Sequence, residues 1–92
     1  MNKYESVVII NPNLEAEGIK ALIAKISDLI NSNGTVSSVE ELGKRKLAYE
    51  IKKNKEAYYV QFNFESKPEA IAELERIYRI TDGILKFITV RK

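Results

Sequence analysis

The spacing of apolar residues predicts an α+β domain built from four strands and two helices. Four segments are rich in β-branched or aromatic residues or alternate apolar with polar residues, at positions 4–10, 36–51, 57–64 and 84–91. Between them, apolar residues recur every three or four positions at 19–30 and 68–79. This order, β-α-β-β-α-β, is that of the ferredoxin-like α/β plait. Right-handed crossovers then place both helices on one face of a four-stranded antiparallel sheet.

Length and composition favour one globular domain over residues 1–92. Apolar residues make up 45% of the chain and charged residues 30%. The chain has no cysteine and no histidine, which excludes disulfides, thiol catalysis and the most frequent general base. The longest apolar run, Val7–Ile10, is far shorter than the roughly 20 residues of a membrane helix. No signal-peptide core follows the first residue, so we expect a cytoplasmic protein without a membrane partner.

The first strand is YESVVII, at residues 4–10, and Asn11-Pro12-Asn13 is a turn signal that ends it. The helix that follows has one apolar stripe, formed by Ile19, Leu22, Ile23, Ile26, Leu29 and Ile30. We expect Gly34 to cap its C-terminus.

The second strand, 36–51, alternates in phase except near Gly43, where we expect a bulge. Asn54 marks a hairpin turn, and AYYVQFNF at 57–64 predicts the third strand.

The second helix is expected to begin with a capping box, in which Ser66 is the N-cap, Pro68 lies in the first turn and Glu69 follows the serine by three residues. It should run to about Arg79, and Asp82-Gly83 then turns the chain into the strand 84–91. The predicted core includes Leu22, Ile26, Val60, Phe62, Leu74 and Phe87.

Two helices can cover only one face of such a sheet. If the even-numbered residues of 4–10 point to the helices, the uncovered face carries Val7, Ile9, Tyr59, Ile88 and Val90. A contiguous exposed apolar patch marks a partner site, although scattered apolar residues also occur on ordinary surfaces.

The net charge of +2 does not by itself imply a nucleic-acid partner, but the cations are clustered. A basic run comprises Lys44, Arg45, Lys46, Lys52, Lys53 and Lys55. Its first three members stand on an expected edge strand, where cations also serve to block unwanted pairing.

Single-stranded RNA is one candidate partner, because plait sheets in RNA-recognition motifs stack bases on aromatic residues. The third strand matches that motif at Lys55, Val60 and Phe62, and approximately at Tyr59, but it lacks the glycines of the motif. With Tyr59 as its one outward aromatic residue, this strand offers little surface on which bases can stack.

An enzyme is the rival class. Acylphosphatases share the plait, yet the loop Asn11-Pro12-Asn13 has no cation to hold a phosphate, and adjacent Glu40 and Glu41 point to opposite faces of a strand. We find no glycine-rich phosphate loop, metal-ligand cluster or activated nucleophile, and we expect no catalysis, cofactor or small-molecule substrate. A regulatory plait that binds a small molecule stays open, because nothing in the sequence identifies a ligand.

Several stretches, taken together, resemble one family across essentially the whole chain. They are KYE at 3–5, NPN at 11–13, VEELG at 39–43, RKLAYEI at 45–51 and RITD at 79–82. In this combination they closely resemble the bacterial small-subunit ribosomal protein six family. The pairing of N-P-N with E-E-L-G-x-R-x-L-A-Y is specific.

The resemblance implies a structural protein of the small ribosomal subunit in the cytoplasm. Family members pair with small-subunit ribosomal protein eighteen and bind with it to the central domain of 16S ribosomal RNA. Carried over residue by residue, the partner-protein interface is expected at Glu40, Glu41, Arg45 and Lys46, together with Tyr59 and Ile88 of the uncovered face. Contact with ribosomal RNA is expected at Lys3 and Lys86, with Arg91 and Lys92 as additions.

Overall fold

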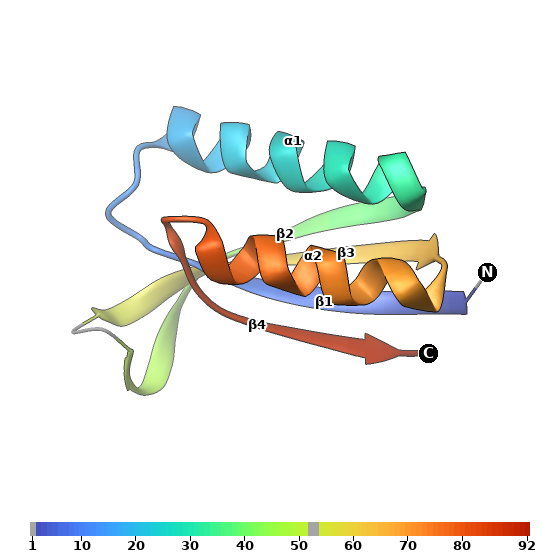
Figure 1. The fold of residues 1–92 in the computed structure, drawn as a ribbon. Helices are drawn as coiled ribbons and strands as arrows, with labels where there is room; N and C mark the ends of the chain where they lie inside the picture. Colours follow the sequence, from blue (N-terminus) through green and yellow to red (C-terminus); the bar gives the residue numbers. More distant parts are fainter. Residues whose placement is uncertain (1, 52–53) are drawn as a thin grey trace.

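The computed structural model describes residues 2–51 and 54–92. Along the chain lie β1 (Asn2–Ile10), α1 (Ala16–Asn33), β2 (Gly34–Ile51), β3 (Asn54–Ser66), α2 (Pro68–Ile80) and β4 (Ile84–Arg91). These strands form one antiparallel sheet in the order β2-β3-β1-β4. Both helices lie on the same face of the sheet, and the two chain ends lie at the same end of the molecule (Figure 1). The predicted plait, with β2 and β4 as edges, is confirmed.

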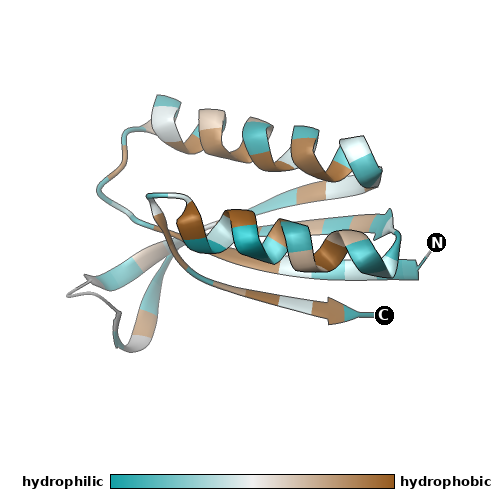
Figure 2. Cartoon of the chain, in the orientation of Figure 1, coloured by the Kyte–Doolittle hydropathy of each residue, from teal (hydrophilic) through white to brown (hydrophobic). Residues whose placement is uncertain are grey.

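The core fills the space between the helices and the sheet. In β1, Tyr4, Ser6, Val8 and Ile10 are buried, as the alternation predicted. The helix α1 packs over β2 and β3 and α2 over β4. Hydrophobic and hydrophilic residues alternate along both helices (Figure 2), and each helix has buried apolar residues that belong to the core. The core cluster also contains Leu22, Ile26, Ile30, Val60, Phe62, Phe64, Leu74, Tyr78 and Ile84.

A buried hydroxyl cluster joins α2 to two strands. The Ser6 Oγ shares hydrogen bonds with the Tyr78 hydroxyl, at 3.0 Å, and with Thr89 Oγ1, at 3.1 Å. Burial raises the pKa of Tyr78 to about 12, because the phenolate would lose its hydration there. The Ser6 hydroxyl bonds both partners, so the cluster links α2, β1 and β4 through one hydrogen-bond network.

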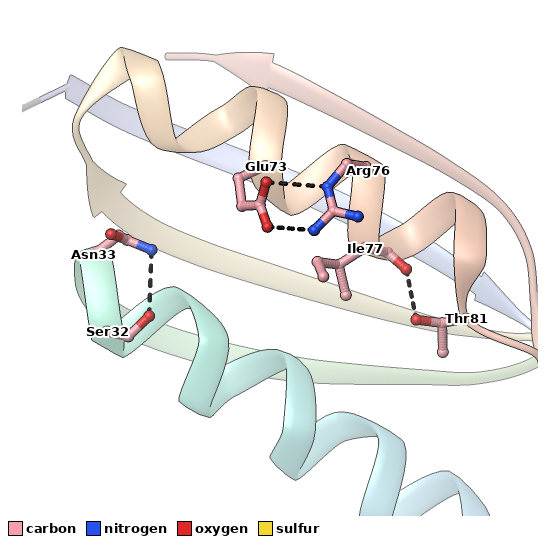
Figure 3. Close-up of polar contacts among 6 residues, drawn as sticks. All are labelled: Ser32, Asn33, Glu73, Arg76, Ile77 and Thr81. Atoms are coloured by element: carbon pink, nitrogen blue, oxygen red, sulfur yellow. Dashed lines mark hydrogen bonds and ion pairs between the residues drawn. The ribbon is translucent and has the colours of Figure 1, made fainter.

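The turns between elements follow the sequence signals. The Asn11 side chain accepts a hydrogen bond from the Asn13 amide, at 2.9 Å, which stabilises the turn after β1. Gly83 has a φ of 97°, a conformation that favours glycine, and it begins the return into β4. At the end of α2, Thr81 Oγ1 donates to the Ile77 carbonyl at 2.5 Å (Figure 3).

One of the two predicted caps is wrong. Gly34 stands at the C-cap position of α1, as predicted, where it is extended, with φ −177°, and also begins β2. A side chain there would collide with the carbonyl of Glu65, so the reason for glycine is a close approach between strands. Ser66 is the buried last residue of β3, and its hydroxyl donates to the Lys67 carbonyl. Lys67 occupies the N-cap position of α2 without a side-chain bond.

Two burial predictions also need correction. Phe87 is only half-buried, because it lies on the edge strand β4 beneath the margin of α2. Ile9 points away from the helices, as expected, yet it is only 6% exposed. Its cross-strand neighbours are Tyr59 and Lys86, and such long side chains can cover a smaller residue between them.

The strands β2 and β3 form a long ribbon that extends beyond the helices (Figure 1). Its register shifts between Glu41 and Gly43, and Gly43 has a φ of 84°, which confirms the predicted bulge. Asn54, expected to mark the hairpin turn, is the first residue of β3 and pairs with Ile51. Lys52 and Lys53 of the basic run lie outside the described residues.

Candidate functional site

The sheet face without helices, called the open face below, is organised in rows that cross the strands. Residues paired across strands share a face, so the registers define these rows. One row consists of Glu40, Gln61, Val7 and Ile88. The next consists of Gly43, Tyr59, Ile9 and Lys86. The five apolar residues predicted for this face all belong to it.

The apolar part of the open face is most exposed on β4. Ile88 is 51% exposed and Val90 is 47% exposed, whereas Val7 and Tyr59 are half-buried. Such neighbours form a patch that water solvates poorly, and the patch runs from β4 across β1 to β3. Gly43, paired with Tyr59, has no atom within 4 Å of the position a side chain would take, so the surface beside Tyr59 is open.

The charges expected at the protein interface alternate along β2. Glu40 pairs with Gln61 and Arg45 with Ala57, so both point to the open face. Glu41 pairs with Val60 and Lys46 with Glu56, so these two point to the opposite side. All four side chains are exposed. The edge therefore presents both signs of charge on both sides of the sheet.

One of these charges is held in place by a neighbouring strand. The Tyr58 hydroxyl donates a hydrogen bond to Glu41 Oε1, at 3.2 Å. Burial, together with the Glu41 carboxylate, raises the pKa of Tyr58 above its usual value. The bond spans β3 and β2 on the side opposite the open face, and it orients Glu41 there.

Two of the cations expected to contact RNA meet at one end of the open face. The Lys92 amide donates to the Lys3 carbonyl at 2.9 Å, so the chain continues the pairing of β4 with β1. Lys92 Nζ donates to the Asn63 Oδ1 of β3, also at 2.9 Å. Lys3 pairs with Glu65 and is exposed. This end of the face is thus a mixed polar surface with two cations.

The other two expected cations, Lys86 and Arg91, belong to β4. Lys86 is exposed on the open face, about 20 Å along the strand from Lys92 at the usual rise per residue. Arg91 pairs with Tyr4 and therefore points to the helix side, where it donates to Asn2 Oδ1 at 3.3 Å. The structure accordingly places three of the four expected cations on the open face and Arg91 on the opposite side.

Arg79 makes a contact that sequence reasoning missed. The guanidinium carbon of this exposed residue lies over the Phe87 ring, 5.7 Å from its centroid. The contact joins α2 to β4 across the turn, so no periodicity within either element could reveal it. The available signal was a cation in the last turn of a helix followed by an aromatic residue on the next strand.

These surfaces suit binding better than catalysis. In residues 2–51 and 54–92, no group of three or more carboxylates lies together as metal ligands would. The helices in that part of the chain are also too short or too polar to span a membrane. What the described residues offer is an apolar patch, a mixed-charge edge and separate cations, which are the features of macromolecular contact.

Comparison with known proteins identifies the family. Residues 3–91 match the family model described as Ribosomal protein S6. The small ribosomal subunit protein bS6 of Clostridium perfringens (strain SM101 / Type A) is 50% identical over 93 residues, with 100% of this chain and 98% of the relative covered. Its counterpart in Caldanaerobacter subterraneus subsp. tengcongensis is 46% identical over 92 residues, covering 99% and 97%.

A solved structure agrees with the sequence relatives. The crystal structure of the 30S ribosomal protein S6 from Thermotoga maritima superposes with a TM-score of 0.94 at 36% identity, covering 99% of this chain and 87% of that one. The family model spans nearly the whole chain, and the relatives match in sequence and in fold. The chain therefore belongs to the ribosomal protein S6 family, whose members are structural, non-enzymatic components of the small ribosomal subunit.

Proposed function

We propose that this protein is a structural constituent of the small ribosomal subunit that binds the central domain of 16S ribosomal RNA together with ribosomal protein eighteen. Family membership supports the first part, and it also supports a location in the cytoplasmic ribosome and contact with ribosomal RNA. The joint binding is the finer part of the proposal. It rests on the resemblance and on the separation between the apolar patch beside the β2 edge and the cations of the RNA surface.

The single observation that carries the proposal is the apolar patch of the open face, most exposed at Ile88 and Val90, beside the charged β2 edge. Ile88 is 51% exposed in the chain alone, and the row of paired residues that contains it ends in Glu40 on β2. Apolar area flanked by charges of both signs is the pattern of a protein interface, in which burial supplies affinity and charges fix the register. The partner protein would cover Tyr59 and Ile88 and meet the charges of β2.

The RNA surface of this proposal lies at β4 and the N-terminus. Lys3, Lys86 and Lys92 point to the open face, and Arg91 points to the helix side. Separate cations neutralise phosphates without reading bases, which suits a structural RNA protein. Stacking on the sheet as in RNA-recognition motifs is less well supported, because Tyr59 is the one aromatic residue among those that the cross-strand pairs of the described residues place on the open face.

Titration of the protein into a 16S central-domain RNA fragment, with and without ribosomal protein eighteen, tests the proposal. We expect tight binding only when both proteins are present. Equal affinity for unrelated single strands by this protein alone would contradict joint binding and favour the RNA-recognition mode. No binding under either condition would reject the proposal.

A further inference from the structure

A hollow of about 270 Å³ opens between the last turn of α2 and the beginning of β4. Its lining consists of Tyr78, Arg79, Ile84, Leu85, Lys86 and Phe87. Pockets for whole small molecules are concave sites of roughly 300 to 1,000 Å³. This hollow is smaller and open to solvent, so it suits one unit of a longer chain better than a free metabolite.

The arginine at this hollow lies over one ring of a tilted aromatic pair. The Arg79 guanidinium lies over the Phe87 ring, and that ring packs against Tyr78 with centroids 5.0 Å apart and an interplanar angle of 46°. Tyr78 is in turn fixed by its hydrogen bond to Ser6. A guanidinium resting on a ring loses little further freedom when it binds, while the donors along its edge stay available.

The donors of Arg79 are not taken up by a carboxylate. In the described part of the chain, Arg79 forms no ion pair, although Glu75 lies one turn earlier on the same helix. Arg76 differs, because its Nε and Nη2 donate to both oxygens of Glu73 at 3.1 and 2.6 Å (Figure 3). Arg76 and Arg79, two exposed arginines of one helix, therefore differ in whether their guanidinium N–H groups are free to bind an anion.

We propose that Arg79, seated on Phe87, binds a phosphate of the ribosomal RNA backbone, with the adjoining sugar in the hollow beside it. This inference rests on the proposed RNA-binding function and extends the RNA surface to the helix side of β4. The charged residues of β4 itself, Lys86 and Arg91, are both cations, and one sign of charge along an edge suits a polyanion. A planar fork is also the geometry that phosphate oxygens accept in pairs.

The test compares Arg79→Ala with Arg76→Ala, which removes the same charge from the same helix. Affinity for the central-domain RNA fragment is measured with ribosomal protein eighteen present, over a range of salt concentrations. We expect Arg79→Ala to weaken binding about tenfold and to flatten the slope of log affinity against log salt by about one unit. Arg76→Ala should change affinity less than about twofold, because that arginine is already paired.

Two further variants separate the role of the ring from that of the charge. Arg79→Lys should keep the salt slope but lose part of the affinity, since the fork is lost and the charge remains. Phe87→Leu should also keep the salt slope and weaken binding, because the aromatic ring beneath the Arg79 guanidinium is removed. Thermal unfolding of each variant checks that the fold is unchanged.

The outcomes distinguish this inference from the proposed function. If the wild-type protein binds the RNA and Arg79→Ala behaves like Arg76→Ala, the inference fails while the proposed function stands. If the wild-type protein does not bind the RNA at all, both fail. If a polyglutamate chain of equal charge competes as well as an RNA oligomer, Arg79 serves an acidic protein partner and the inference is overturned.

Discussion

The two edges of the sheet, β2 and β4, differ in charge, regularity and exposure. β2 carries Glu40 and Glu41 as well as Arg45 and Lys46, and its register shifts at bulges. β4 is shorter, carries cations but no acid, and exposes Ile88 and Val90. An edge strand that is unpaired in the free protein has to avoid pairing with other chains. β2 does so by charge and bulges, whereas β4 has less of this protection.

The difference indicates what each edge meets. Charges of both signs are useful where a partner protein supplies the complementary signs, and they penalise wrong partners. Cations alone are useful along a phosphate backbone, where every neighbour has the same sign. We therefore propose that β2 and the apolar part of the open face, including Ile88 on β4, meet ribosomal protein eighteen, and that the cations of β4 together with Arg79 meet RNA. Whether the two edges bind different partners can be tested with variants of each edge and of the core that supports both.

The largest effect is expected from Phe62→Ala. Phe62 is fully buried on β3, which joins β2 to β1 and thus supports both edges. Its removal should lower the free energy of unfolding by about 3 to 5 kcal/mol through lost burial and a cavity. Chemical denaturation measures this. Both binding activities should fall together with the folded fraction, and a loss below about 1 kcal/mol would contradict the assigned core.

The second largest effect is expected from the ionisation of Tyr78, which bonds Ser6 of β1 and, through it, Thr89 of β4. Tyr78 has a pKa of about 12 when folded and about 10 when unfolded, so the folded state holds its proton more tightly. The stabilisation of the folded state by protonated Tyr78 is complete below pH 10. It decreases between pH 10 and 12, by roughly 2 to 3 kcal/mol. Denaturation at a series of alkaline pH values should show this loss.

Tyr78→Phe is the control for that pH dependence, because other tyrosines titrate in the same range. The variant should lose about 1 kcal/mol at neutral pH, from the bond to Ser6, and should have a shallower alkaline decline. An identical decline in both proteins would show that Tyr78 does not ionise in the unfolding transition.

The topology and most of the core could be predicted from sequence, whereas the N-cap of α2 and the half-buried positions could not. Alternation in β1 and the stripe of α1 follow directly from the geometry of strands and helices, so they survive in the fold. Ser66 failed as a cap because β3 continues through it, and propensity does not encode where a strand stops.

The candidate site was predictable only as a set of positions. Alternation placed Tyr59 and Ile88 on the open face correctly, because it needs only the parity of each strand. The seat of Arg79 on Phe87 and the burial of Ile9 depend on tertiary neighbours from other elements. No local pattern carries that information.

The β2 edge is tested by replacing both Arg45 and Lys46 with valine. Both are exposed, so the fold should keep or gain stability. Affinity for ribosomal protein eighteen, measured by calorimetry, should fall by up to about thirtyfold, since two favourable charges are lost. Sedimentation of the variant alone should reveal self-association, because the edge is no longer protected.

A matched control removes Lys20 and Lys25 from α1, which are exposed and far in sequence from both edges. It changes the net charge equally and should leave partner affinity unaltered. If the valine variant also keeps its partner affinity, Arg45 and Lys46 only guard the edge. A collapse of its thermal stability would show that their side chains are needed for the fold.

The smallest effects are expected from single cations of the RNA surface. Alanine at Lys3, Lys86, Arg91 or Lys92 should flatten the salt slope of RNA affinity by up to about one unit, with little effect on folding. Lys20→Ala serves as the control. An unchanged slope in all four variants would remove these residues from the RNA surface and leave Arg79 alone on that edge.

The most direct test of the division between the edges measures two affinities for two double variants. One variant is Arg45→Ala with Lys46→Ala on β2, and the other is Arg79→Ala with Lys86→Ala at β4. Affinity for ribosomal protein eighteen is measured without RNA, and affinity for the central-domain fragment is measured with saturating partner protein. We expect the β2 variant to lose only partner affinity and the β4 variant to lose only RNA affinity. Equal losses of both affinities in both variants would contradict the division.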